Sequence, residues 1–196
     1  MTRSNWLLTM QRYRGQHELS SFIRMKKVLV LGCSGSGKST FAVKLHKQTK
    51  LPLYHLDNIW WKADRTHITR DEFDEYLDEL VKRDSWIIDG DYSRTYEKRI
   101  AACDTVFFLD YGESVCMDGI ACRVGKERPD MPWTEDTLDP ELVKLVRNYE
   151  KEDKPKLMGL FAKYPEKTVI TFKNREEAEK WISNRAGDMM PTIYIG

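Results

Sequence analysis

Residues 28–41 read VLVLGCSGSGKSTF, and this stretch decides the fold. Its first four residues are a short apolar run, which is typical of a strand covered on both faces. Gly32, Gly35 and Gly37 follow within six residues, and so much glycine is unfavourable in a strand or a helix. The order of apolar run, glycine-rich loop and helix-forming residues indicates a strand whose tip turns sharply into a helix.

The loop matches G-x-x-x-x-G-K-[ST], the Walker A phosphate-binding pattern, in the strand–helix context that the motif requires. Glycines let successive backbone amides turn toward an anion, and the helix N-terminus adds the positive end of its dipole. Lys38 would reach the β- and γ-phosphates, and the Ser39 hydroxyl would bind Mg²⁺. The expected nucleotide-binding residues are Gly32, Gly35, Ser36, Gly37, Lys38, Ser39 and Thr40.

The composition fits one globular domain. The chain has 196 residues, 41% of them hydrophobic, which is enough for a single core. Its net charge of +1 argues against a global attraction to nucleic acid or an anionic membrane. No apolar run approaches the roughly 18 residues of a membrane span, and no C-x-x-C pair indicates a zinc site. We expect a cytoplasmic protein.

Four further apolar runs are predicted to be strands, at residues 53–56, 86–88, 106–109 and 168–172. Helical segments separate them, and a capping box of Thr69 and Glu72 marks the start of one. Strands that alternate with helices form a parallel sheet with helices on both faces, so we expect a three-layer α/β fold. Ligands bind beyond the carboxyl ends of such strands.

Acidic residues follow the predicted strands at this binding edge. Asp89 comes after residues 86–88 and is the expected Walker B carboxylate, which would hold Mg²⁺ directly or through water. Asp110 has the same local sequence context and is the alternative. A turn or capping aspartate would also suit either position. Ser39 and Asp89 are therefore the expected metal ligands.

The segment YHLDNIWWK, residues 54–62, is the expected acceptor side. Asp57 would take a proton from an acceptor hydroxyl or position it, as a kinase base does. Trp60 would stack on a ring of the acceptor, although large aromatic residues are more often packed. His55 fits a core histidine better than a catalytic one.

Arginines would supply the positive charge that phosphoryl transfer requires. Arg94 and Arg99 follow the third predicted strand, and we expect them to bind the acceptor. Arg123 and Arg128 lie in a basic segment, and we expect them to close over the phosphates as catalytic lid residues. A solvated salt bridge is the alternative for each arginine.

The chain resembles the adenylate-kinase-like P-loop kinases, and more narrowly the bacterial DNA topology modulation proteins. The resemblance rests on GCSGSGKST, LPLYHLDNIWWK, WIIDGDYSRTYEKRI, CDTVFFLDY and residues 122–124, and it covers residues 28 to about 128. It implies a P-loop NTPase fold of the adenylate- or shikimate-kinase type, with a five-stranded parallel sheet in the order 2-3-1-4-5 and a small mobile lid. It also implies ATP with Mg²⁺ as the phosphoryl donor.

Two departures from that family lie on the acceptor side. Nucleoside monophosphate kinases read Asp-Gly-x-Pro-Arg after the third strand, whereas residues 89–94 here read DGDYSR. They also carry Thr-Gly-Asp after the second strand, whereas residues 55–57 here read HLD. The sequence therefore leaves the identity of the acceptor open.

Three regions are expected along the chain. Residues 1–24 are polar and without clear periodicity, and we interpret them as a mobile N-terminal extension that lacks a secretion signal. Residues 25–185 form the P-loop kinase-like domain, with its lid at about 113–135. Residues 186–196 are assigned to a C-terminal tail.

The leading functional interpretation is a kinase that transfers the ATP γ-phosphoryl group to a small nucleoside- or nucleotide-like acceptor near Asp57. The alternative is an ATP-responsive, DNA-associated regulatory protein with little or no kinase activity. Only the family resemblance suggests nucleic acid as a partner, and no membrane partner is expected. No N-K-x-D motif is present, which argues against a GTPase switch.

Overall fold

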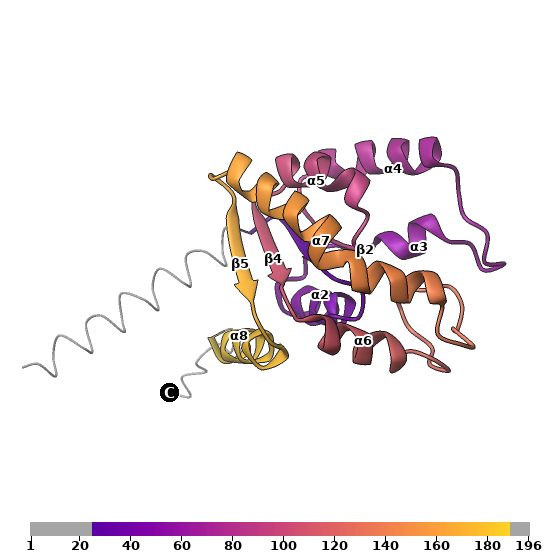
Figure 1. The fold of residues 1–196 in the computed structure, drawn as a ribbon. Helices are drawn as coiled ribbons and strands as arrows, with labels where there is room; N and C mark the ends of the chain where they lie inside the picture. Colours follow the sequence, from indigo (N-terminus) through magenta and orange to yellow (C-terminus); the bar gives the residue numbers. More distant parts are fainter. Residues whose placement is uncertain (1–24, 189–196) are drawn as a thin grey trace, which may run out of the picture.

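A computed structural model describes residues 25–188 (Figure 1). It contains one parallel sheet in the order β2-β3-β1-β4-β5, which confirms the expected fold class and strand order. The predicted extension at residues 1–24 and residues 189–196 of the predicted tail lie outside the described residues. The strands are β1 (Lys27–Gly32), β2 (Leu53–His55), β3 (Trp86–Asp89), β4 (Thr105–Leu109) and β5 (Thr168–Phe172).

The central strands explain why the sheet forms where it does. Residues 28–31 of β1 and 106–109 of β4 are at most 1% exposed, as continuous apolar runs require. The two strands pair in register, with Gly32 opposite Leu109. The phosphate-binding loop therefore leaves the sheet at its centre, between two fully buried strand ends.

Helices cover both faces of the sheet, as Figure 1 shows. The P-loop helix and the last helix lie on one face, and the helices at residues 70–82, 96–102 and 140–163 cover the other. Two shorter helical segments follow β2 and β3, and another helix follows β4. The helical elements are α2 (Lys38–Thr49), α3 (Leu56–Trp60), α4 (Arg70–Lys82), η1 (Ser93–Thr95), α5 (Tyr96–Ala102), α6 (Glu113–Ala121), α7 (Pro140–Lys163) and α8 (Arg175–Asp188).

The helix starts follow local side-chain chemistry. The predicted capping box is confirmed, because the Glu72 amide donates to the Thr69 hydroxyl at 3.2 Å and the Thr69 amide donates to Glu72 at 2.8 Å. Asp139 accepts the Glu141 amide at 2.9 Å at the start of α7. The last helix, α8, continues to Asp188, and the domain boundary at residue 185 stays a prediction.

An aromatic cluster anchors the helix that carries the phosphate loop. Phe41 on α2 lies 5.0 Å from Phe107 and 5.6 Å from Phe172, measured between ring centroids. Trp181 on α8 packs edge-on against Phe107 at 4.7 Å. Buried aromatic contacts of this kind fix α2 rigidly against β4 and β5. The first turn of α2 is therefore held in one place.

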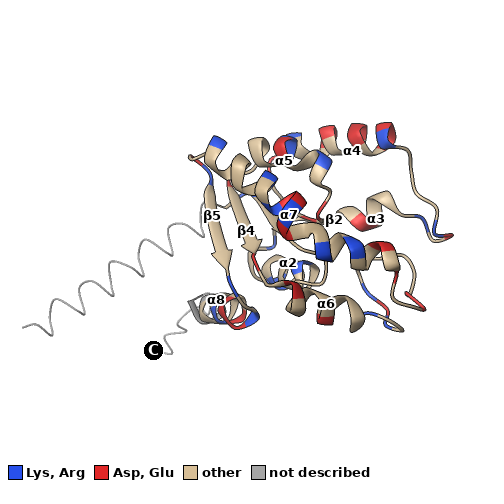
Figure 2. Ribbon diagram, viewed as in Figure 1, with Lys and Arg blue, Asp and Glu red and all other residues tan. Residues whose placement is uncertain are grey.

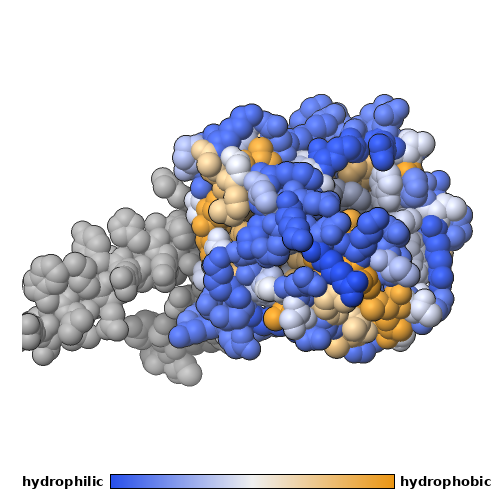
Figure 3. All heavy atoms as spheres, viewed as in Figure 1, coloured by the Kyte–Doolittle hydropathy of each residue, from blue (hydrophilic) through white to orange (hydrophobic). Residues whose placement is uncertain are grey.

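The predicted lid at about 113–135 consists of two different structures. Its first part is α6, whose Cys116 and Ile120 are fully buried. Residues 122–139 run outside the helices, and we call this stretch the lid segment. The face shown in Figure 3 is mostly hydrophilic, with apolar residues around α6 and along β5. Among the described helices, none combines the length and apolar character that a bilayer crossing demands.

Candidate active site

The loop between β1 and α2 has the shape of an anion-binding site. Gly35 and Gly37 have φ angles of 86° and 95°, which L side chains rarely adopt. Gly37 is the N-cap of α2 and supplies no side-chain acceptor for the first amides of the helix. Those amides are the donors that a phosphate would satisfy.

A glycine–glycine contact joins this loop to α6. A Cβ on Gly35 would lie 2.0 Å from the Cys116 carbonyl oxygen, and a Cβ on Gly119 would lie 1.9 Å from the Gly35 carbonyl oxygen. Arg175 at the start of α8 donates to the carbonyls of Gly35 and Val115, each at 3.2 Å. Gly119 was not identified from the sequence, although a glycine inside a helix often indicates such close backbone packing.

Gly119→Ala is expected to destabilise the protein by about 2–4 kcal/mol, because the new methyl group meets backbone that cannot move alone. It should also weaken nucleotide binding, since the phosphate loop must shift. Urea unfolding and ADP titration measure the two effects. Gly159→Ala in α7 is the matched control, because a Cβ there meets nothing within 4 Å. It should be neutral or slightly stabilising, and equal effects for the two variants would contradict the packing argument.

Lys38 and Ser39 open α2, directly after the loop. Lys38 is 8% exposed and its Nζ donates to the Cys33 carbonyl at 3.0 Å. The Ser39 hydroxyl donates to Asp130 Oδ2 at 2.7 Å. The hydroxyl of Ser36 is buried and has no hydrogen-bond partner among the described residues. The three side chains all belong to the loop or to the first turn of α2, where a bound phosphate would lie.

Asp89 ends β3 beside this loop and is 3% exposed. Its Oδ2 lies 2.9 Å from Nδ1 of His55, the residue in register on β2. Burial opposes protonation of His55, but the hydrogen bond and charge of Asp89 outweigh it and raise the His55 pKa. The other oxygen, Asp89 Oδ1, is buried without a hydrogen-bond partner in the described part of the chain. His55 is thus a partner of the expected metal ligand, a role that the sequence did not indicate.

Asp110, the alternative to Asp89, is engaged elsewhere. Its carboxylate pairs with Lys154 at 2.7 Å and with Lys173 at 2.5 Å. Burial favours its protonated form, but the two lysines outweigh this effect and lower the Asp110 pKa. These contacts favour Asp89, which keeps one free oxygen.

The oxygen atoms near Ser39 are suitable ligands for Mg²⁺, which prefers oxygen. They include the Ser39 hydroxyl and the unpartnered Oδ1 of the nearby strand-end residue Asp89. Across residues 25–188, no three His, Cys, Asp or Glu side chains are grouped so that they could hold a metal on their own. A magnesium ion here would therefore take its remaining ligands from phosphate oxygens and water, as nucleotide-bound Mg²⁺ does.

The strand predicted at residues 53–56 ends one residue earlier, at His55, and Leu56 begins α3. Asp57 therefore lies in the first turn of that helix. The Tyr92 hydroxyl donates to Asp57 Oδ1 at 2.8 Å. Burial raises the Asp57 pKa; the Tyr92 bond and Lys38 oppose the shift, and the charges of Asp89 and Asp130 add to it. Asp57, Asp89 and Asp130 therefore share one electrostatic environment with Lys38.

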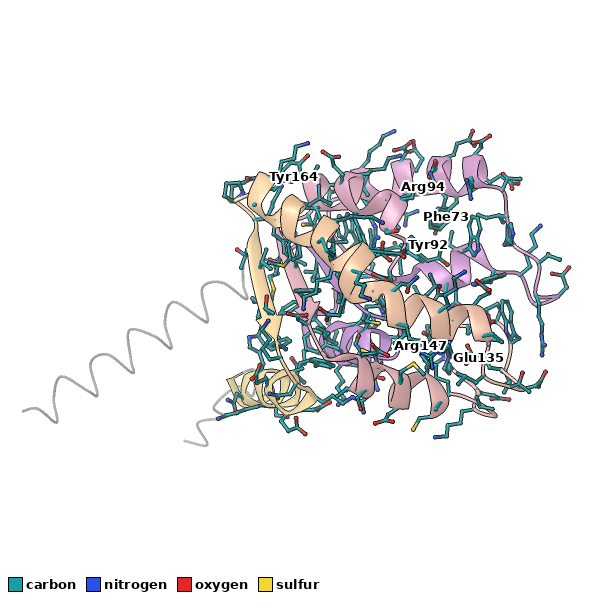
Figure 4. All side chains as sticks on the ribbon, in the orientation of Figure 1. Phe73, Tyr92, Arg94, Glu135, Arg147 and Tyr164 are labelled. Atoms are coloured by element: carbon teal, nitrogen blue, oxygen red, sulfur yellow. The ribbon has the colours of Figure 1, made fainter. Side chains whose placement is uncertain are left out.

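Trp60 belongs to an aromatic cluster. Its ring stacks on His67 at 4.5 Å and meets Phe73 and Tyr92 edge-on at 5.4 and 6.1 Å. Figure 4 shows Phe73 and Tyr92 close together beside α3, and their centroids are 4.9 Å apart. These contacts match the packed alternative for Trp60, whose role is to support the segment that carries Asp57.

The two arginines expected on the acceptor side both pair with groups of the protein itself. Arg94 forms a bidentate pair with Asp74 of α4 at 2.6 and 2.8 Å. Arg99 is fully buried and donates to the Thr95 hydroxyl and to the carbonyls of Gly90 and Tyr92, at 2.8–3.0 Å. The contacts of Arg99 hold the loop after β3, and neither set of contacts supports acceptor binding.

Asp91 is a second carboxyl group in this loop that the sequence did not single out. It accepts a hydrogen bond from the Tyr96 hydroxyl. Burial raises the Asp91 pKa to about 6, although Lys38 and Tyr96 favour the ionised form. Asp91 therefore adds negative charge on the acceptor side near Lys38.

The lid segment contacts the phosphate side through its charged residues. Arg128 is largely buried, with Nε 3.6 Å from Asp130 and Nη2 3.9 Å from Glu135. Asp130 is 5% exposed and accepts the Ser39 hydroxyl. Burial and the charge of Arg128 lower the Arg123 pKa, whereas the charges of Glu135, Asp130 and Asp57 oppose the shift, so these carboxylates are close enough to act on Arg123. The structure thus brings Arg123 and Arg128 to the site.

The lid segment also contacts the acceptor side. The Asn58 side chain donates to the Pro129 carbonyl at 2.7 Å, and Trp61 meets Trp133 edge-on at 5.1 Å. Arg65 pairs with Asp136 at 2.5 Å. The lid segment therefore bridges the phosphate loop and the segment that begins with α3.

Two shikimate kinases are among the solved structures that resemble this chain. Shikimate kinase from Acinetobacter baumannii, in complex with shikimate, is 15% identical with a TM-score of 0.57, and the match covers 87% of this chain and 98% of that one. Shikimate kinase from Bacteroides thetaiotaomicron is 16% identical with a TM-score of 0.54, covering 83% and 97% of the two chains. No family model and no curated protein matches the sequence. The chain therefore has the P-loop NTPase fold of the shikimate kinases.

Proposed function

We propose that the protein is a Mg²⁺-dependent phosphotransferase that passes the γ-phosphoryl group of ATP to a small-molecule acceptor. The observation that carries this proposal is the phosphate loop, in which Lys38 and Ser39 open a helix behind two left-handed glycines. The fold supports it, since the similar structures are kinases and one was solved with shikimate bound. Asp57 and the lid arginines face the same cluster of charges.

In the proposed reaction, the loop amides and Lys38 bind the phosphates of ATP. When bound by Ser39 and Asp89, Mg²⁺ would neutralise charge that develops on the phosphate oxygens. Asp57 accepts the proton of the acceptor hydroxyl at Oδ2, because Tyr92 occupies Oδ1. The raised pKa of Asp57 makes it a stronger base than an exposed aspartate. Arg123 and Arg128 add positive charge from the lid segment, which also excludes water.

Within this proposal the acceptor is nucleoside- or nucleotide-like and reacts through a hydroxyl group. An acceptor phosphate would need a free cation beside it, as charge-assisted pairing requires. Arg94 is instead held by Asp74, and Arg99 by backbone carbonyls. These contacts favour a hydroxyl over a monophosphate as the reacting group.

A panel of acceptors tests the proposal. Nucleosides, nucleotides, sugars and shikimate would each be added to the protein with ATP and Mg²⁺, and ADP release would be measured. We expect one chemical class to raise the rate well above that of hydrolysis. If every acceptor fails and only slow hydrolysis remains, a regulatory ATPase is the better description.

The narrower kinship with DNA topology modulation proteins is also part of the proposal, supported by motifs at residues 32–40, 51–62 and 86–100. It does not make DNA a partner. Figure 2 shows basic and acidic residues interspersed along α4, α5 and α7. The expected cytoplasmic location stays a prediction.

Fluorescently labelled duplex DNA should show no change in anisotropy when protein and ATP are added at physiological ionic strength. Non-specific DNA binding depends on counterion release by clustered lysines and arginines, and this chain has a net charge of +1. A signal that falls steeply with salt, with a slope of several ions, would instead favour the DNA-associated function.

A further inference from the structure

A carboxylate of the lid segment contacts the hydroxyl that the Walker A motif assigns to magnesium. Asp130 Oδ2 accepts the Ser39 hydroxyl at 2.7 Å, although the two residues are 91 positions apart in the chain. Asp130 is 5% exposed, and the Nε atom of Arg128 lies 3.6 Å from its other oxygen. Burying a carboxylate costs desolvation energy, but here the charge of Arg128, the Ser39 hydroxyl and the charge of His55 outweigh that cost and lower the Asp130 pKa, which favours the ionised form that a metal ligand needs.

A buried carboxylate at Asp130 is not needed merely to hold the lid segment in place. The lid segment is already fastened by the Asn58–Pro129 hydrogen bond, the Trp61–Trp133 contact and the exposed Arg65–Asp136 pair. Asp136 and Arg65 are 71% and 56% exposed, so their pair forms at little desolvation cost. Asp130 is instead buried next to the loop that would bind a triphosphate.

Several carboxylates gather at that position, with Lys38, His55 and Arg128 as the positive groups that act on them. Asp57 and Asp89 lie in the same environment as Asp130, and Asp89 Oδ1 is buried without a partner among the described residues. A bound phosphate would add further negative charge beside these carboxylates. A divalent cation would offset this added negative charge, as it does beside the phosphates of a nucleotide.

The observed distance suits two ligands of one magnesium ion. Neighbouring oxygens in an octahedral Mg²⁺ shell, each about 2.1 Å from the metal, are about 2.9 Å apart. Ser39 Oγ and Asp130 Oδ2 are 2.7 Å apart, so a small shift would let both bind the same ion. On the lid segment itself, Arg128 lies 3.6 Å from Asp130 and 3.9 Å from Glu135, so its positive charge stays beside the Asp130 carboxylate.

We propose that Asp130 is a magnesium ligand that the lid segment delivers beside Ser39. This assignment rests on the proposed function, because it takes the metal to arrive with a nucleotide. In this assignment a carboxylate of the lid segment binds the metal directly, together with the Ser39 hydroxyl of the phosphate loop. Lid closure and metal binding then stabilise each other, and because the lid segment also contacts Asn58 and Trp61, metal binding favours closure over the acceptor side.

Manganese binding tests this assignment without relying on turnover. Free Mn²⁺ would be measured by electron paramagnetic resonance in titrations of the full chain with saturating ADP. Asp130→Asn should weaken Mn²⁺ binding by about tenfold or more, because it removes a charged oxygen ligand. Metal-free ADP binding should be unchanged or stronger, since a negative charge is lost. Glu127→Gln, at an exposed carboxylate of the same lid segment, should bind Mn²⁺ like the wild type.

The outcomes separate the assignment from the proposed function. Equal or tighter Mn²⁺ binding by Asp130→Asn overturns the assignment, and tighter binding would show that Asp130 competes with the metal. If the wild type binds no Mn²⁺ with ADP, the proposed function itself fails. Should Asp130→Asn not fold, Fe²⁺ with ADP, ascorbate and peroxide can be used to cleave the wild-type chain near the metal. Cleavage beside residue 130 supports the assignment, and its absence there overturns it.

Discussion

Lys38→Ala is expected to lower ATP turnover by about a thousandfold or more while leaving the fold intact. Lys38 Nζ is the charged group aimed into the phosphate loop, where it donates to the Cys33 carbonyl at 3.0 Å. A nucleotide would take over this donor, and the loop amides cannot replace its full positive charge. The variant should therefore have a lower rate of phosphoryl transfer as well as a weaker affinity for ATP.

The fold should survive because Lys38 makes only one hydrogen bond within the described chain, and such a bond contributes about 1 kcal/mol. Lys38→Met keeps the apolar stem and separates loss of charge from loss of packing. Lys44→Ala is the matched control, since Lys44 lies on the same helix and pairs with Glu179 at the surface. ADP release and thermal unfolding should be measured for all three variants. Turnover by Lys38→Ala at the wild-type rate would refute the assigned site.

The parts of this fold that could be predicted depend on neighbours in sequence. The loop, the strand at residues 28–31 and the Thr69 capping box are short-range patterns, and the structure confirms each of them. Continuous apolar runs indicated a covered parallel sheet, because only buried strands tolerate such runs. The strand order was implied by the family resemblance, and the observed pairing agrees with it.

The parts that were missed depend on contacts between distant residues. Asp130 follows a proline in a loop, and nothing nearby indicates that it returns to Ser39. His55 pairs with Asp89 only because β2 and β3 are neighbours in register. Gly119 matters only because α6 approaches the phosphate loop. Each role follows from the packing of the sheet and its helices, which no local pattern encodes.

The two arginines placed on the acceptor side show the same limit. Arg94 and Arg99 both follow the third strand, and an arginine there suits a phosphate as well as an internal partner. Arg94 finds Asp74 on α4, and Arg99 finds three acceptors in the loop after β3. A guanidinium has several donors in a fixed fork, so nearby carbonyls and carboxylates can satisfy it completely. Sequence position alone cannot distinguish such an arginine from one that binds substrate.

Asp57→Asn is expected to reduce kcat for the phosphoryl acceptor by about 10²- to 10⁴-fold, the usual contribution of a general base. Asparagine keeps the shape of the side chain, and its carbonyl oxygen can still accept the Tyr92 hydroxyl. ATP binding should therefore change little, which ADP titration would verify. Asp74→Asn is the matched control on neighbouring α4, because that carboxylate pairs with Arg94 and does not face the proposed acceptor.

The pH dependence of kcat distinguishes a general base from a residue with a purely structural role. Asp57 works as a base only when ionised, and burial raises its pKa, so kcat should fall on the acid side at a higher pH than the roughly 3.9 of a free aspartate. The Tyr92 hydroxyl favours the ionised form. Tyr92→Phe should therefore move the acid limb to still higher pH while activity persists above it. Removing a hydrogen bond to a carboxylate makes the carboxylate easier to protonate. If the acid limb of Tyr92→Phe stays where it is or moves to lower pH, Asp57 is not the base.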